Sequence, residues 1–279
     1  MVNHLFKAPI APLFVPGDKP ERFHTAAASG ADAVILDLED AVAPDRRAFA
    51  RKAVAEHTIS NVPVIVRLNA HITDDFALDL DALRETPFDA LMLSKAQHAD
   101  DVLAVHARLG REVPIIVLVE TALAFADLGR LLAASGVVLA AFGSLDLALD
   151  LGCTPNREAL AYTRSQLVLA CRIAGLESPL DGVCTSLDDL DLISEESRHA
   201  AILGFGGKLV IHPRQVASIQ AAFLPDEKDL EWAHAVLAAQ PGGEAVRVGG
   251  SMVDRPLIER AKRILAHQAT PKQFPGKSQ

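Results

Sequence analysis

Cysteine is scarce in this chain of 279 residues. Its three thiols, Cys153, Cys171 and Cys184, are odd in number, and none stands in a CxxC spacing. Disulfide frameworks and thiolate zinc sites need cysteines in pairs or in short, regular spacings. We therefore expect buried or incidental thiols in the reducing cytoplasm, where we expect the protein to reside.

Long apolar segments and an excess of basic residues are also lacking. No uninterrupted apolar run approaches the ~20 residues that a membrane-spanning helix needs, and residues 1–14 show no secretory signal. The 36 acidic residues exceed the 27 basic ones, which gives a net charge of -9. These features argue against a membrane or a nucleic acid as the main partner. A small anionic substrate stays compatible with them, because a local basic cluster can still bind an anion.

What the chain does contain is a series of short apolar runs separated by amphipathic segments rich in Ala and Leu. Continuous Val/Ile/Leu runs are typical of parallel strands that helices cover on both faces. Strands that alternate with helical segments indicate βαβ units. We therefore predict an α/β fold, a (β/α)8 TIM barrel over residues 1–222, with strands near 12–16, 33–37, 63–68, 89–93, 114–119, 137–142, 180–183 and 208–212.

The texture of the sequence changes after the eighth run. Residues 215–239 predict a helix, and a glycine-rich stretch with a short strand near 245–248 follows. A last helix carries an apolar side formed by Leu257, Ile258, Ala261, Ile264 and Leu265, and residues 270–279 read as disordered. We predict that residues 223–279 form a short C-terminal flap and helix, which act as a lid or pack on a neighbouring subunit.

Charged residues stand at the ends of the apolar runs. Six runs end on or beside such a residue: Asp37 with Glu39, Arg67, Lys95, Glu120, Asp146 and His212. The active site of a TIM barrel lies at the carboxyl ends of its strands. This pattern therefore predicts an enzyme.

Glu120 and Asp146 are the best candidates for metal ligands. They follow neighbouring strands, so two carboxylates would stand at one rim of the barrel. Mg2+ prefers hard oxygen ligands, and no histidine or cysteine cluster suggests zinc instead. The alternative is that both are helix caps or solvated loop acids, since Thr121 can cap the helix after Glu120.

Arg67 lies within a run that is otherwise apolar. A buried arginine needs a carboxylate partner, which is either a substrate or an acid such as Asp37 or Glu39 on the preceding strand. Lys95 is a candidate Schiff-base lysine, although a metal pair would make that chemistry redundant and favours an electrostatic or structural role. His212 fits a buried core imidazole or a ligand contact equally well.

Two glycine-containing basic loops, at 17–23 and 204–208, lack the P-loop pattern. Lys19 and Arg22 nevertheless stand beside an expected helix start, where a phosphate can bind. Near the carboxyl terminus, Asp254 precedes Arg255 and Pro256 and reads from the residues alone as a helix N-cap.

Six ordered motifs, from Leu13 to about residue 266, resemble the citrate lyase β-subunit-like family of the HpcH/HpaI aldolase superfamily. They are LFVPGDKPERF, ADAVILDLEDAVAP, VRLN, VETA, FGSLDLALDLG and GFGGKLVIHPRQ. The resemblance implies a TIM barrel and a Mg2+-dependent (or Mn2+-dependent) carbon–carbon lyase. Its expected substrates are CoA thioesters of 3-hydroxy acids such as malyl, citramalyl or citryl, so that CoA is part of the substrate and an oxo acid is a product.

The resemblance also assigns roles to particular residues. It makes Glu120 and Asp146 metal ligands, Arg67 a catalytic and substrate-binding residue, and Asp37 and Glu39 its catalytic network. We expect Lys19, Arg22, Gly143, His212 and Pro213, together with Arg67, to bind substrate or CoA. The stretch GGSMVDRP implies that Asp254 enters the site of a neighbouring subunit as a catalytic residue, which requires a homo-oligomer, a trimer or a hexamer. Ser94 departs from the family, whose members often have proline before the strand-four lysine, so a shared role for Lys95 stays open.

Two other functions fit the same motifs. One is a CoA-independent, metal-dependent aldolase acting on pyruvate or another oxo acid, which would need neither Asp254 nor a phosphate-binding loop. The other is a citrate lyase β subunit that works only in a complex with an acyl carrier protein. The presence of the Asp254 segment favours a stand-alone lyase.

Overall fold

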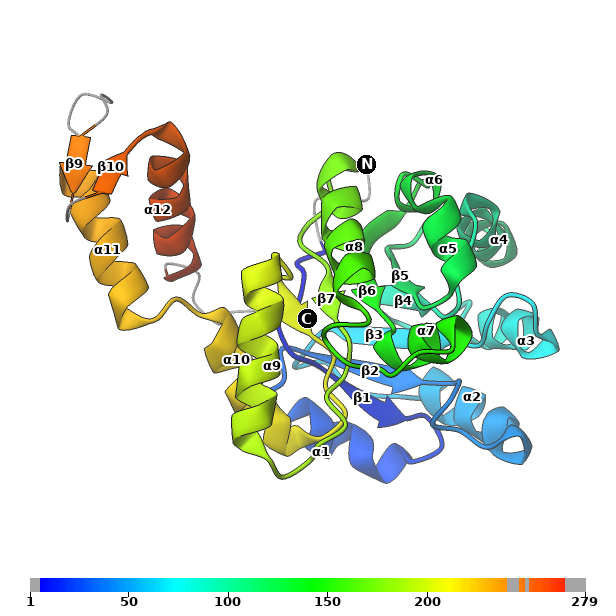
Figure 1. The fold of residues 1–279 in the computed structure, drawn as a ribbon. Coiled ribbons are helices and arrows are strands. Elements are labelled where there is room, and N and C mark those ends of the chain that lie inside the picture. The colour runs from blue at the N-terminus through cyan, green and yellow to red at the C-terminus, as the bar shows by residue number, and fades with distance from the viewer. Residues whose placement is uncertain (1–5, 240–245, 249–250, 269–279) are drawn as a thin grey trace. The chain divides into compact units, whose positions relative to one another are not determined.

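The computed structural model describes residues 6–239, 246–248 and 251–268. Eight parallel strands follow one another around a barrel in sequence order, as Figure 1 shows. They are β1 (Pro12–Pro16), β2 (Ala33–Asp37), β3 (Val64–Leu68), β4 (Ala90–Leu93), β5 (Ile115–Val119), β6 (Val137–Phe142), β7 (Leu180–Asp181) and β8 (Gly207–Lys208). The predicted TIM barrel is confirmed.

The barrel closes between its first and last strands. Leu13 in β1 pairs in parallel with Val210, beyond the end of β8. The Phe14 N–H donates to the Val210 carbonyl at 2.8 Å, and the Val210 N–H donates to the Pro12 carbonyl at 3.0 Å. Strands β7 and β8 are shorter than the predicted strands 180–183 and 208–212. Their regular parallel pairing ends at Asp181 and Lys208.

A buried ion cluster joins these two short strands to the helices outside them. Asp181 accepts from Lys208 Nζ at 2.8 Å and from Arg164 Nε at 3.0 Å. The Lys208 side chain is only 2% exposed, so the charge has no access to water and depends on Asp181. The lysine of the GFGGK loop therefore fastens β8 to β7.

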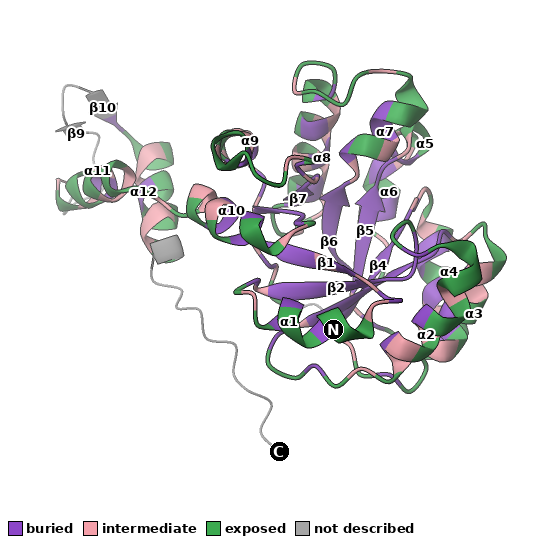
Figure 2. Ribbon diagram, turned by 90° about the horizontal axis from the view of Figure 1, so that it is seen from below, coloured by how far each residue is buried: buried purple, intermediate pink, exposed green. Residues whose placement is uncertain are grey.

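Helices cover the outside of the barrel. They are α1 (Phe23–Ala27), α2 (Arg47–Ala55), α3 (Asp74–Ala82), α4 (Ala99–Leu109), α5 (Ala122–Ala126), α6 (Leu128–Leu132), α7 (Ser144–Leu151), α8 (Ala161–Ile173), α9 (Leu190–Leu203) and α10 (Val216–Phe223), with the 3-10 turns η1 (Pro20–Arg22), η2 (Pro44–Arg46) and η3 (Pro213–Gln215). Figure 2 shows buried strands and helices with one buried and one exposed face. This burial on both faces explains why the strands read as continuous apolar runs.

The interior of the barrel is filled by alternate strand residues. Ile35, Ile65, Met92, Ile116 and Leu118 belong to one core cluster and are at most 3% exposed. Because side chains alternate along a strand, the next inward positions toward the carboxyl ends belong to Asp37, Arg67 and Glu120. The strand period thus carries three charged residues to one end of an apolar core.

The chain divides into two compact units, Met1–Gln220 and Ala221–Gln279. The second contains α11 (Glu227–Ala238), the antiparallel strands β9 (Val246–Val248) and β10 (Ser251–Val253), and α12 (Arg255–Gln268). Its own core includes Ala233, Val236, Val253 and Ala261, against which pack Trp232, Leu237, Leu257, Ile258, Ile264 and Leu265. The predicted apolar side of the last helix is confirmed, and a role for this unit as a lid on a neighbouring subunit stays a prediction.

One helix prediction was wrong. Residues 215–239 form two helices, α10 and α11, rather than one. Pro225 lacks an N–H and disfavours helical geometry in the residue before it. Asp226 then starts α11 as an N-cap that accepts from the Asp229 N–H at 2.8 Å. The predicted disordered tail, 270–279, and residue 245 of the predicted strand lie outside the described residues.

Among the described residues, no helix combines the length and apolar character that a bilayer crossing requires.

Candidate active site

Six charged residues at the carboxyl ends of β2 to β6 form what we call the mouth cluster: Asp37, Glu39, Arg67, Lys95, Glu120 and Asp146. Ion pairs and electrostatic interactions link them. Asp37 pairs in register with Arg67 across β2 and β3, which brings the two side chains together. The geometry brings together the predicted strand-end charges of β2 to β6, and the sixth predicted residue, His212, has no ion pair with them among the described contacts.

Arg67 is held as a fork over Asp37. Its Nε lies 2.6 Å from Asp37 Oδ1 and its Nη2 lies 2.5 Å from Oδ2, while Nη1 is 3.2 Å from Glu39 Oε2 and 3.3 Å from Asp40 Oδ2. The guanidinium also lies 4.7 Å from the centre of the Phe14 ring. Burial alone would lower the pKa of Arg67, but these carboxylates outweigh it and raise the pKa above its ordinary value. Arg67 is a permanently charged and oriented cation.

Glu120 is buried and electrostatically crowded. It is 1% exposed, and its Oε1 accepts from the Lys95 N–H at 2.8 Å. Burial first, and then the neighbouring Glu39 and Asp146 carboxylates, raise the pKa of Glu120 to about 8. The alternative that Glu120 is a solvated loop acid or a cap is excluded, because Thr121 caps α5 by accepting from the Ala124 N–H at 3.3 Å.

Lys95 lies between Glu39, a partner of Arg67, and Asp146, a metal candidate. Its Nζ lies 2.7 Å from Glu39 Oε1 and 3.9 Å from Asp146 Oδ1. Burial would lower the pKa of Lys95, but Glu39, Glu120 and Asp40 raise it above its ordinary value. A Schiff-base lysine must lose its proton to attack a carbonyl, so this environment opposes that alternative.

The residues fit a divalent cation with hard oxygen ligands. Glu120 and Asp146 supply two carboxylates, which matches Mg2+ sites completed by substrate and water. Within the described part of the chain, no three His, Cys, Asp or Glu side chains are arranged to hold a metal by themselves. The raised pKa of the buried Glu120 shows that its surroundings do not fully balance the negative charge of its ionised form. A bound cation beside the carboxylate would balance this charge. Glu120 and Asp146 would hold Mg2+, or Mn2+ in its place.

Gly143 makes room for the Glu120 side chain. A Cβ at this position would collide with Glu120 Cβ and Oε2, although the backbone, with φ -87°, would accept an alanine. The residue lies between β6 and α7, and its N–H donates to the Val119 carbonyl at 3.0 Å. The absence of a side chain at Gly143 therefore leaves space for the Glu120 carboxylate. A direct contact of Gly143 with substrate stays a prediction.

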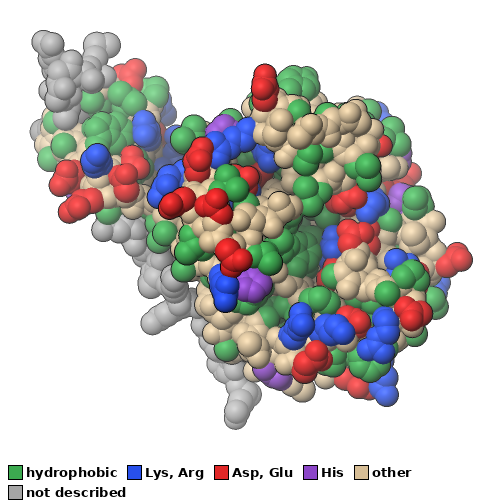
Figure 3. All heavy atoms as spheres, turned by 60° about the horizontal axis from the view of Figure 1, so that its bottom comes forward, with side chains coloured by type: hydrophobic (Ala, Val, Ile, Leu, Met, Phe, Trp, Pro, Cys, Tyr) green, Lys and Arg blue, Asp and Glu red, His purple; other side chains and the backbone are tan. Residues whose placement is uncertain are grey.

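The other predicted binding residues have different surroundings. Lys19 Nζ lies 3.9 Å from Asp18, whose carboxylate is also 3.5 Å from Arg46 Nε, and Arg22 is exposed at the end of η1. Acidic and basic side chains are interspersed on the face that Figure 3 presents. Lys19 and Arg22 follow β1, whose last residue Pro16 is in register with Asp37, so their loop begins at the same end of the barrel.

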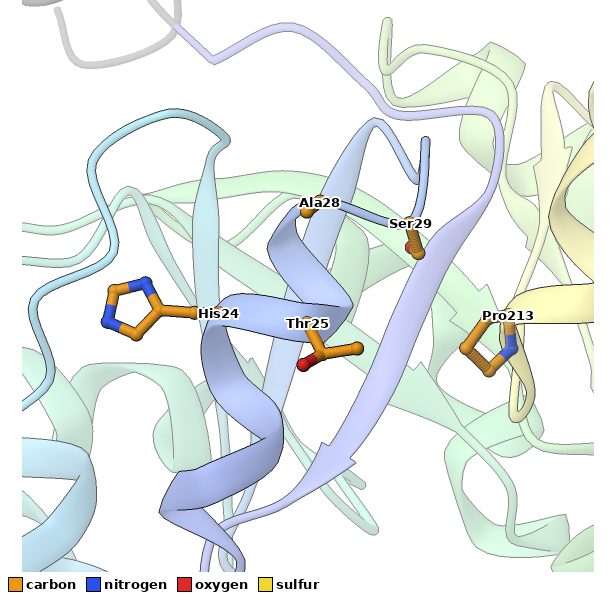
Figure 4. Close-up of a pocket in the computed structure, with 5 residues that line it drawn as sticks. All are labelled: His24, Thr25, Ala28, Ser29 and Pro213. Atoms are coloured by element: carbon orange, nitrogen blue, oxygen red, sulfur yellow. The ribbon is translucent and has the colours of Figure 1, made fainter.

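His212 and Pro213 start η3. His212 Nδ1 accepts from the Arg214 N–H at 3.2 Å, so the half-buried ring acts as a cap rather than as a core imidazole. Pro213 lines a groove of about 570 Å³ together with His24, Thr25, Ala28 and Ser29, as Figure 4 shows. No residue of the mouth cluster lines this groove. A role for His212 and Pro213 in binding substrate stays a prediction.

Asp254 belongs to the second compact unit. It is exposed, and its carbonyl accepts from the N–H groups of Leu257 and Ile258 at the start of α12. The catalytic role that the resemblance implies for it stays a prediction.

Sequence reasoning missed a buried hydrogen-bond network that begins two residues after Arg67. Asn69, at the end of the VRLN motif, donates to the Leu38 carbonyl and to Asp79 Oδ2, both at 2.8 Å. Asp79 is fully buried and also accepts from Arg51 at 3.2 Å. An acid on the buried side of α3 was the available signal, since buried acids need partners.

Comparison with known proteins agrees with this geometry. The HpcH/HpaI aldolase/citrate lyase family model matches residues 11–213. A citrate lyase subunit beta-like protein from Mycobacterium tuberculosis is 37% identical over 261 residues, which are 91% of this chain and 93% of that protein. A (3S)-malyl-CoA thioesterase from Cereibacter sphaeroides is 33% identical over 267 residues, which are 93% of each protein.

A solved structure shares the architecture. The crystal structure of protein CitE from Mycobacterium tuberculosis, in complex with magnesium, acetoacetate and coenzyme A, matches with a TM-score of 0.85 at 35% sequence identity. The match covers 94% of this chain and 99% of that one. The chain therefore belongs to the HpcH/HpaI aldolase/citrate lyase family of carbon–carbon lyases.

Proposed function

We propose that this protein is a Mg2+-dependent lyase that cleaves, or forms, a 3-hydroxyacyl-CoA such as malyl-, citramalyl- or citryl-CoA. The observation that carries the proposal is the position of Glu120 and Asp146 at the same barrel mouth as the oriented cation Arg67. Magnesium and coenzyme A bound to the similar CitE structure support the choice of cofactor and substrate class.

Mg2+, held by Glu120 and Asp146, would supply Lewis acidity at an oxygen of the oxo-acid part. Arg67 stabilises the alkoxide that forms when the 3-hydroxyl group loses its proton, and this oxygen becomes the carbonyl of the oxo acid as the carbon–carbon bond breaks. Asp37 fixes two of the Arg67 nitrogens, so the guanidinium is oriented before substrate arrives and no reorganisation is needed. Because its pKa is raised, Arg67 stays a cation and does not act as the base.

In net terms, cleavage moves one proton from the 3-hydroxyl group to the thioester α-carbon. The bond between the α- and β-carbons breaks, the hydroxyl carbon becomes the carbonyl of the oxo acid, and the acyl-CoA is left as an enolate. Solvent takes up the hydroxyl proton as the alkoxide forms, and the protonated carboxyl of Asp254 from a neighbouring subunit donates a proton to the α-carbon. Solvent then reprotonates Asp254, and in the condensing direction the ionised Asp254 removes the α-proton. General acid-base help of this kind contributes about 10² to 10⁴ in rate.

This role for Asp254 requires a homo-oligomer, a trimer or hexamer, in which the second unit covers a neighbouring site. Water would then be excluded while the enolate exists. Lys19 and Arg22, on the loop after β1, are proposed to bind phosphate oxygens of CoA. His212 and Pro213, after β8, are proposed to contact the same part of the substrate.

Thioester hydrolysis is a second candidate. It is favoured by the 33% identical relative named a (3S)-malyl-CoA thioesterase. In that reaction water attacks the thioester carbonyl and free CoA leaves. The other product is the 3-hydroxy acid, whose carbon–carbon bonds are all intact. The two activities therefore differ in their products.

The decisive experiment incubates purified protein with malyl-, citramalyl- and citryl-CoA, in Mg2+ and in EDTA, and separates the products by chromatography. Metal-dependent release of acetyl-CoA and an oxo acid supports the lyase and identifies its acyl group. Free CoA alone supports the thioesterase. Absence of turnover on all three, with metal bound and the fold intact, would instead favour the CoA-independent aldolase or a subunit that needs an acyl carrier protein.

A further inference from the structure

Four carboxylates lie around Lys95. Asp40 Oδ1 is 4.0 Å from its Nζ, and the other three, Glu39, Glu120 and Asp146, could compete for one cation. Glu39 and Asp146 lie 2.7 and 3.9 Å from its Nζ, and Glu120 accepts from its backbone N–H. Glu39 and Glu120 are close enough to repel each other electrostatically. A divalent cation at Glu120 and Asp146 would therefore attract Glu39 as a third ligand unless something else holds it.

Glu39 is held by two cations. Lys95 Nζ binds its Oε1, and Arg67 Nη1 lies 3.2 Å from its Oε2. The Oε2 atom is buried, and its approach to Arg67 does not have hydrogen-bond geometry. The contact with Lys95 is therefore the better formed of the two, and the same Nζ lies 3.9 Å from the metal candidate Asp146.

The backbone of Lys95 is also unusual. With φ 50°, it is the one non-glycine residue with positive φ among those described. Such a conformation costs free energy and persists where the surroundings enforce it, often at functional sites. In this conformation the N–H of Lys95 donates to Glu120 while its side chain donates to Glu39. One residue therefore holds both a metal candidate and a partner of Arg67.

We infer that Lys95 is a positioning residue that keeps Glu39 beside Arg67 and out of the coordination shell of the metal. The inference rests on the proposed metal site and adds a determinant of its ligand number. With two protein carboxylates, an octahedral Mg2+ keeps positions for water and for substrate. A third carboxylate would fill one of these positions and would leave Arg67 without one of its partners.

A positioning role and a merely structural role predict opposite changes in metal affinity when Lys95 is replaced. Loss of the ammonium frees Glu39 to bind the metal and removes a positive charge near it, so metal affinity should increase while turnover falls. A structural role predicts that metal affinity and turnover fall together. The metal affinity is measured without substrate, so the test does not depend on which acyl-CoA the protein uses.

The experiment measures Mn2+ binding by calorimetry, and bound water by the relaxation of water protons, in a double-mutant cycle. We expect Lys95→Met to bind Mn2+ at least about tenfold more tightly, with fewer metal-bound waters. Glu39→Gln should change affinity little in the wild type and reverse most of the gain in Lys95→Met. Lys95→Arg should restore the wild-type affinity, and Lys52→Met, which removes an exposed lysine charge, should leave it unchanged.

Unchanged or weaker Mn2+ binding in Lys95→Met, or additive effects of the two substitutions, would overturn the inference while leaving the proposed lyase intact. Absence of Mn2+ binding to the wild-type protein would overturn both. Lys95→Gly, which relieves the backbone conformation, replaces Lys95→Met in the cycle should the latter not fold.

Discussion

Arg67 and Asp37 form a two-point ion pair at the mouth of the barrel, with N–O distances of 2.6 and 2.5 Å. The register of β2 and β3 sets the two residues side by side. The pair is buried, so each charge depends on the other. It therefore contributes both to the orientation of Arg67, the proposed substrate-binding cation, and to the integrity of the barrel mouth.

Arg67→Lys should retain the charge and lose most of the activity. A lysine ammonium is a point charge and cannot make the two-point contact with Asp37. We expect kcat/KM to fall by about 10² or more, the range seen when a preorganised donor at a developing charge is removed. Steady-state kinetics and thermal melting check this. A lysine variant with near wild-type kcat/KM would show that the fork is dispensable.

Asp37→Ala should destabilise the protein itself. Removal of one partner from a buried ion pair typically costs about 3–5 kcal/mol, and Arg67 would keep only the single contacts of its Nη1 with Glu39 and Asp40. Denaturant unfolding measures this free energy. Asp81→Ala, which removes an exposed partner of Arg108, is the matched control and should change stability little. Equal effects of the two substitutions would contradict the role of burial.

Glu120→Gln should abolish stabilisation by metal without destabilising the metal-free fold. The raised pKa shows that the ionised Glu120 is disfavoured in its buried position, so a neutral amide removes repulsion with Glu39 and Asp146. In the wild type, Mg2+ at about 100 times its Kd should add about 2.7 kcal/mol to stability. Melting curves in Mg2+ and in EDTA test both points. A metal-induced shift in the variant equal to that of the wild type would contradict Glu120 as a ligand.

Metal affinity should increase with pH up to about 8. A proton on Glu120, whose pKa is raised to about 8, competes with the cation, so binding below that pH releases a proton. The same shift has the opposite sign for the metal-free fold. Stability from the protonated Glu120 is fully present below the unfolded pKa, ordinarily 4.5, and is lost as the pH rises through about 8. Calorimetry in buffers of different ionisation enthalpy counts the released proton, and pH-independent affinity would contradict the assignment.

Gly143→Ala should impair metal binding through a steric effect. The added methyl group would collide with the Glu120 side chain and displace its carboxylate. Gly129→Ala is the matched control, because a Cβ at that helical position meets nothing within 4 Å and alanine favours a helix by about 1 kcal/mol. Mn2+ calorimetry on both variants is the measurement. Retention of full affinity in Gly143→Ala would show that the loop adapts to the methyl group.

Asp254→Asn should fold normally and lose the chemical step. The side chain of Asp254 is exposed. Its contacts with the start of α12 are made by its backbone carbonyl, which the substitution keeps. We expect an unchanged melting temperature and oligomeric state, with turnover reduced by about 10² or more. Mixing this variant with Arg67→Lys should restore part of the activity if the two residues act across subunits. A large fall in melting temperature with turnover retained would favour the capping role.

The sequence by itself determined the barrel and the candidates at its mouth. Apolar runs that end on Asp37, Arg67 and Glu120 predict parallel strands and a charged rim, because alternation of side chains along a strand is a local property. The break at Pro225 was equally local and was overlooked in the prediction of one helix over 215–239. The strand-end pattern also predicted Asp146, for which the residues alone left a helix-start acid as an alternative, and the family motifs favoured the metal ligand.

Only the tertiary structure decided how these charges are shared. The fork of Arg67 on Asp37, the contact of Arg51 with buried Asp79 and the two contacts of Lys95 each join residues that lie far apart in the chain. The positive φ of Lys95 has no sequence signal, since it is enforced by packing and hydrogen bonds rather than by residue type. The pKa of Glu120 likewise depends on burial, on the two carboxylates of Glu39 and Asp146 and on Lys95, which become its neighbours only after the barrel has closed.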